Sequence, residues 1–127
     1  MQKKIEVTSA IINENRVEFQ VGEAQIELTK IKATGQMLVD SDALSFIYIA
    51  ENDSEYVYLS FPITVWKELQ EMIEKNYIPV LVDGKDKLTL ENMTEELTYL
   101  IGNIEGNANY GDEMVEKVEN IFLKQSS

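Results

Sequence analysis

The sequence predicts one α+β domain over residues 1–127, built on an antiparallel sheet of about seven to eight strands. Two observations predict this fold. Short segments that alternate apolar and polar residues, separated by turn-forming residues, recur through the first two thirds of the chain. Apolar residues then recur at helical spacing after Pro62 and again near the C-terminus. This order predicts one helix after a central hairpin and a C-terminal helical hairpin.

The N-terminal third predicts four short strands. Residues 3–8 and 16–21 alternate apolar and polar side chains around the turn-prone residues 13–15, which predicts a first hairpin. Residues 24–28 then predict the start of a third strand, whose alternation breaks near residues 29–30 and indicates a bulge or an early end, and residues 37–39 predict a fourth strand.

The centre of the predicted sheet is the strand pair 44–50 and 56–61, joined by the polar residues 51–55. An odd-length connection would separate aromatic from aliphatic side chains, because successive residues of a strand point to opposite faces. One face would carry Phe46, Tyr48, Tyr56 and Tyr58, and the other Ile47, Ile49, Val57, Leu59 and Phe61. Since both faces are apolar, we expect helices to cover each of them.

The remaining elements follow from local signals. Pro62 suits the first turn of a helix over residues 64–76, in which Trp66 is expected to pack in the core rather than stack on a ligand. The Asp83-Gly84 step predicts a last hairpin between residues 79–82 and 87–90.

Two helices are expected over residues 93–104 and 114–122. Asn92 with Glu95 resembles a capping box, and Gly106 can end the first helix in the left-handed conformation.

Composition excludes several classes of function. The chain has no cysteine and no histidine, so disulfides, thiolate nucleophiles and histidine bases are absent. Its net charge is −12, and residues 91–127 hold eight acids against Lys117 and Lys124. Such a surface repels nucleic acid and anionic membranes. We find no apolar run long enough for a membrane span and no signal-peptide core, and therefore expect a cytoplasmic protein.

We predict no catalytic residue, no metal site and no cofactor. Two carboxylates can hydrolyse glycosides without histidine or cysteine, but nothing in the sequence marks one acid pair among the 23 acids. The sequence therefore favours a protein that is not an enzyme.

Three groups of residues are candidate sites. The loop between the last helices is polar and contains glycines, and we expect Tyr110 to be an exposed anchor in it, while Asn109 and Asp112 can cap the following helix. The candidate partner contacts are Asn103, Glu105, Asn107, Asn109, Tyr110, Asp112 and Glu113.

The other two groups lie in the sheet. Tyr48, Tyr56 and Tyr58 form a candidate small-molecule pocket, although they would also serve as a second core layer under the C-terminal helices. Asp40 and Asp42 form a tight turn or a weak cation site. A calcium loop starting at Asp40 is rejected, because Ser45 stands where that loop needs glycine.

Two stretches resemble the YjbL-like family of uncharacterised cytosolic proteins of low-GC Gram-positive bacteria. They are residues 35–49, GQMLVDSDALSFIYI, and residues 99–111, YLIGNIEGNANYG. Val65-Trp66 and residues 115–122 also fit the family's pattern. The resemblance implies an intracellular protein of unknown function and supplies no activity, cofactor or catalytic residue.

The leading functional hypothesis is a protein-binding or regulatory module that acts through its acidic C-terminal region. One alternative is a small-molecule sensor with its pocket at the aromatic strand face, and another is an acidic mimic of nucleic acid. The sequence identifies neither the partner nor the oligomeric state.

Overall fold

The structure is a computed structural model that describes residues 2–22 and 27–123. In these residues one mixed sheet has the strand order β3-β4-β5-β1-β2-β6-β7. The strands are β1 Gln2–Asn13, β2 Arg16–Val21, β3 Lys32–Asp40, β4 Ser45–Glu51, β5 Tyr56–Pro62, β6 Ile78–Asp83 and β7 Asp86–Thr89.

The sheet is mixed rather than antiparallel. The α+β class is confirmed, but β1 pairs with β5, and β2 with β6, in parallel. The reason is that the β1–β2 hairpin lies between β5 and β6, which are joined by a helical crossover. Strand pairs joined by a short turn are antiparallel, as the local signals predicted.

The predicted helices are confirmed as α1 Trp66–Lys75, α2 Met93–Ile104 and α3 Asp112–Val118. Three 3₁₀ turns cover Leu28–Lys30, Ile63–Val65 and Ala108–Tyr110, and a π-helical turn continues α3 over Glu119–Leu123. The predicted third strand, 24–28, is wrong at Leu28, which begins a 3₁₀ turn. Residues 24–26 of that prediction lie outside the described residues.

The register of the central hairpin overturns the predicted sorting of its faces. Tyr48 pairs with Leu59 and Ile49 with Tyr58, so Tyr56 and Tyr58 share a face with Ile47 and Ile49. The connection has four residues, 52–55, instead of an odd number.

Asn52 sets this even-length turn. Its side-chain oxygen accepts hydrogen bonds from the backbone nitrogens of Ser54 and Glu55, at 2.9 and 2.8 Å. Its own backbone nitrogen donates to the carbonyl of Glu55 at 3.0 Å. Asparagine favours such a turn because its side chain can replace a backbone acceptor.

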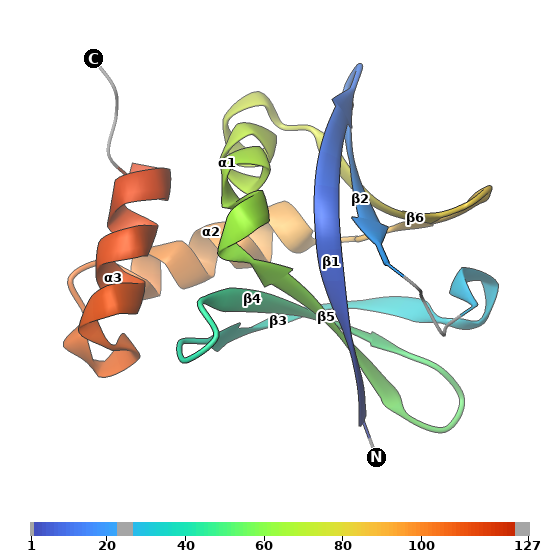
Figure 1. The fold of residues 1–127 in the computed structure, drawn as a ribbon, viewed down its shortest axis with the longest axis horizontal. Coiled ribbons are helices and arrows are strands. Elements are labelled where there is room, and N and C mark those ends of the chain that lie inside the picture. The colour runs from blue at the N-terminus through green and yellow to red at the C-terminus, as the bar shows by residue number, and fades with distance from the viewer. Residues whose placement is uncertain (1, 23–26, 124–127) are drawn as a thin grey trace.

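All three helices lie on one side of the sheet (Figure 1). Trp66 is fully buried there, as predicted, and its indole nitrogen donates to the carbonyl of Phe61 at 3.0 Å. Its ring centroid lies 5.1 Å from that of Phe46 and 5.7 Å from that of Phe122. The expectation of helices on both faces is therefore wrong, because α1, α2 and α3 share one core.

The two edges of the sheet are joined through the side chain of Tyr48. Its buried hydroxyl donates to the carbonyl of Glu91, which follows β7, at 2.6 Å and accepts from the backbone nitrogen of Gly35 in β3 at 3.2 Å. The side-chain nitrogen of Asn92 donates to the carbonyl of Gly35 at 3.1 Å. One tyrosine thus connects β3, β4 and the start of α2.

Glycine is required at position 35. Its φ of +78° lies in the left-handed region, and a Cβ there would lie 3.3 Å from the Cβ of Asn92. Asn92 makes this bridging contact and no side-chain cap on α2, so the predicted capping box is wrong.

We expect Tyr48→Phe to lower the free energy of unfolding by about 1–3 kcal/mol at pH 7, since it leaves the buried partners of the hydroxyl unpaired. Urea denaturation measures this change. Tyr56→Phe is the control, because Tyr56 is 54% exposed and should leave stability unchanged. Equal stability of both variants would show that the hydroxyl of Tyr48 does not join the edges.

Tyr48 also predicts a dependence on alkaline pH. Burial raises the pKa of its phenol from the ordinary 10.0 to about 12, and the charge of Glu91 adds to this, while the hydrogen bond from Gly35 opposes it. The unfolded chain therefore loses this proton first, so the stabilisation is present below about pH 10 and disappears between about pH 10 and 12. In that window we expect stability to fall more steeply in the wild type than in Tyr48→Phe. Parallel pH profiles would contradict this.

Candidate functional site

The face of the sheet opposite the helices carries an open groove of about 470 Å³. Its lining residues are Lys4, Leu38, Val39, Asp40, Ser41, Asp42, Ile47 and Tyr58. The groove brings together three residues predicted as site residues, Asp40, Asp42 and Tyr58. Tyr48 points to the opposite face, so the expectation that Tyr48, Tyr56 and Tyr58 line one pocket is wrong.

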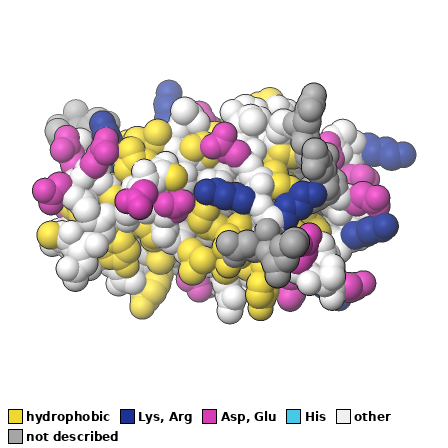
Figure 2. Space-filling model, turned by 60° about the horizontal axis from the view of Figure 1, so that its bottom comes forward, with side chains coloured by type: hydrophobic (Ala, Val, Ile, Leu, Met, Phe, Trp, Pro, Cys, Tyr) yellow, Lys and Arg dark blue, Asp and Glu magenta, His cyan; other side chains and the backbone are white. Residues whose placement is uncertain are grey.

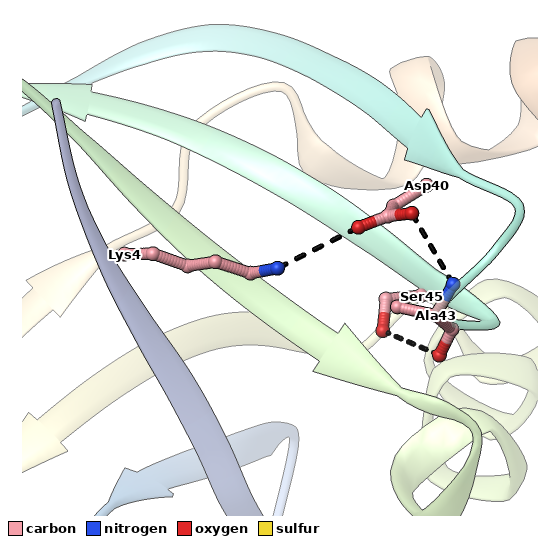
Figure 3. A network of polar contacts seen from close by, with 4 residues as sticks. All are labelled: Lys4, Asp40, Ala43 and Ser45. Carbon is pink, nitrogen blue, oxygen red and sulfur yellow. Dashed lines mark hydrogen bonds and ion pairs between the residues drawn. The ribbon is translucent and has the colours of Figure 1, made fainter.

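The twist of the sheet forms this groove. The ammonium nitrogen of Lys4 in β1 lies 3.5 Å from a carboxylate oxygen of Asp40 at the end of β3, although β5 and β4 lie between these strands (Figure 3). In a flat sheet with this register their Cα atoms would be about 20 Å apart, too far for the two side chains to meet. A strong twist brings opposite corners of the sheet together. The ion pair lines the same groove as Ile47, which is 5% exposed.

Asp40 organises the turn after β3. One carboxylate oxygen accepts from the backbone nitrogen of Ala43 at 3.2 Å, and the other pairs with Lys4. The buried hydroxyl of Ser45 donates to the carbonyl of Ala43 at 3.2 Å. Asp40 thus accepts a hydrogen bond from the backbone of its own turn, whereas Asp42 is exposed. No group of three or more acidic side chains in the described residues is placed to hold a metal ion.

We expect Lys4→Met to change the free energy of unfolding by less than about 1 kcal/mol, because a solvent-exposed ion pair contributes little. Ile47→Ala should cost about 2–4 kcal/mol, because it removes buried apolar atoms of the sheet. Urea denaturation of both variants compares the two effects. A larger loss for Lys4→Met than for Ile47→Ala would show that the ion pair, rather than apolar burial, holds this face together.

The second candidate site is the loop between α2 and α3. Gly106 adopts φ +66°, as predicted, and its backbone nitrogen donates to the carboxylate of Glu119 at 2.8 Å. The side chain of Asn107 accepts from the backbone nitrogen of Asn109 at 3.1 Å and donates to the carbonyl of Asn103 at 3.2 Å. The predicted caps on α3 are wrong, because Gly111 occupies the N-cap position and no side chain caps it.

Five of the seven candidate partner contacts in this region are exposed, and two, Asn107 and Tyr110, are half-buried. Asn103, Glu105, Asn109, Asp112 and Glu113 are exposed. Tyr110 is half-buried and packs against the core, so its predicted role as an exposed anchor is wrong.

An exposed tyrosine of the C-terminal region is Tyr99 of α2, with 66% of its surface accessible. Sequence reasoning missed it, although its position on the helix was a usable signal. The buried stripe of α2 contains Met93, Leu97, Ile101 and Ile104. Tyr99 lies outside that stripe, on the face that also carries Glu95 and Gly102.

Acidic side chains predominate in the C-terminal region. The eight carboxylates between positions 91 and 119 form no ion pair with any base in the part of the chain that the structure describes. In Figure 2 acidic side chains predominate at the end of the molecule where α3 lies, and basic ones lie mainly in the centre and at the other end.

These features define a small α+β protein in which a mixed sheet is covered by helices on one face and polar surfaces are the candidate sites. None of the described helices is long and apolar enough to cross a membrane. The chain belongs to the UPF0738 family, a family of unknown function, whose model matches residues 5–122. The resemblance to a family of uncharacterised proteins is thereby confirmed.

Similar proteins occur in several species of Bacillus. UPF0738 proteins of Bacillus cereus strain G9842 and Bacillus mycoides strain KBAB4 are each 43% identical to this chain over 123 residues. A UPF0738 protein of Bacillus cytotoxicus is 45% identical over 123 residues. Each alignment covers 97% of this chain and 100% of the relative. No solved structure matches this chain.

Proposed function

We propose that this protein is a non-enzymatic protein-binding or regulatory module that acts through the acidic surface of α2, α3 and the loop between them. The observation that carries the proposal is the set of eight carboxylates without a described basic partner. Like charges gathered on one region destabilise a compact fold by mutual repulsion. A basic partner would relieve that repulsion and would be steered to this region over long range.

The loop between the helices supports the same proposal. Hydrogen bonds from Gly106 to Glu119, and around Asn107, hold its backbone in one conformation. A loop that is already ordered loses little conformational entropy when a partner binds. The exposed side chains of Glu105 and Glu113 are therefore presented from a fixed framework.

The test is charge reversal on α3. We expect Glu113→Lys/Glu116→Lys to lose the proteins that co-purify with the tagged wild-type chain from its host under native conditions. The matched control is Asp53→Lys/Glu74→Lys, which changes the net charge equally at exposed positions outside the C-terminal region. Thermal unfolding establishes that both variants fold. Equal recovery of partners by both variants would contradict the proposal.

A further inference from the structure

The outer face of α2 has two features that the fold itself does not explain. The first is Tyr99, the most exposed of the large hydrophobic side chains in the described residues. A single exposed apolar residue is common and needs no explanation by itself. Tyrosine is nevertheless enriched among the residues that dominate the energetics of binding.

The second feature is Gly102, which lies one turn further along the same face. Glycine inside a helix is less stable than alanine or glutamine because it loses more backbone entropy. Apart from its chain neighbours and the nearby backbone of its own helix, no heavy atom of the described residues lies within 4 Å of the position that a Cβ would occupy at Gly102, and its φ is not positive. Neither internal packing nor backbone conformation therefore requires glycine here. Close approach of another molecule would require it.

The rest of this face favours a basic partner. A shallow hollow of about 290 Å³ beside Tyr99 is lined by Asn92, Glu95 and Glu96. A lysine or arginine side chain placed there would meet two carboxylates. Thr98 is exposed and its hydroxyl donates to the carbonyl of Thr94 at 2.7 Å, so this side chain needs no hydrogen bond from a partner. A second copy presenting the same face would bring carboxylates against carboxylates.

We propose that the Tyr99 face, formed by Glu95, Thr98, Tyr99 and Gly102, binds a basic amphipathic helix of another protein. The backbone of that helix crosses α2 at Gly102, because the distance between two packed helices depends on the side chains at their crossing point. Tyr99 is the apolar anchor, and the carboxylates beside it pair with the basic residues of the partner. This inference rests on the proposed function and names the residues of the acidic region that contact the partner.

The test is an NMR titration of the full chain with two synthetic helical peptides, one of leucine and lysine and one in which glutamate replaces lysine. At an ionic strength of about 0.15 M, where long-range attraction is screened, we expect only the leucine–lysine peptide to bind. The shifted amide signals should lie on α2 around Tyr99 and Gly102.

Substitutions test whether binding of the peptide depends on the Tyr99 face or only on the overall negative charge of the protein. We expect Tyr99→Ala and Gly102→Gln each to weaken binding of the leucine–lysine peptide at least about tenfold. Tyr56→Ala, at another exposed tyrosine, should leave binding unchanged. Gly102→Gln should also raise the thermal unfolding midpoint, because glutamine is the better helix former. Loss of binding by Gly102→Gln then cannot be attributed to unfolding.

The other outcomes identify which proposal fails. If the peptide binds both variants as tightly as the wild type but binds Glu113→Lys/Glu116→Lys weakly, the Tyr99 face is overturned and the proposed function stands. If neither peptide binds the wild type, the Tyr99 face is overturned, and the proposed function is decided separately by co-purification with Glu113→Lys/Glu116→Lys. Equal binding of the two peptides would overturn the basic character of the partner.

Discussion

The fold depends on the buried hydroxyl of Tyr48. A buried hydroxyl without partners is costly, and this one is satisfied by groups at two opposite edges of the sheet, the carbonyl of Glu91 beyond β7 and the amide of Gly35 in β3. The sheet is therefore held in a strongly curved form, with Leu90 and Met93 buried where its edges approach each other. Because Glu91 lies two residues before the start of α2, the same bond fixes where that helix begins. The position of the acidic helical hairpin on the sheet follows from this contact.

The sequence predicted most elements but not how the strands are arranged. Alternation of apolar residues and the Asp83-Gly84 turn are local signals, so the N-terminal and last hairpins could be located. The register of the central hairpin could not be predicted, because one side chain, Asn52, selects a turn of even length and exchanges the faces of β5 relative to β4. The parallel strand pairs could not be predicted either, since they join strands that are far apart along the chain.

The candidate sites show the same division between local and distant interactions. The backbone hydrogen bond of Asp40 was predictable, because an aspartate before a turn commonly accepts one from the following residues. The ion pair of Asp40 with Lys4 was not predictable, because these side chains belong to strands that are not neighbours in the sheet and meet only through its twist. Tyr110 and Tyr99 were misjudged for different reasons. The burial of Tyr110 depends on how its loop folds back on the core, whereas the exposure of Tyr99 follows from its phase on α2.

The insertion of the β1–β2 hairpin between β5 and β6 has a consequence for biosynthesis. The hairpin is synthesised before both of its neighbours in the sheet, β5 and β6, which leave the ribosome much later. Until then its two outer edges expose unpaired backbone groups that invite association with other chains. Folding is also slowed, because the long segments between β1 and β5 and between β2 and β6 must close into loops before these parallel pairs can form. Association with other chains is therefore favoured in the interval between synthesis of this hairpin and synthesis of β5 and β6.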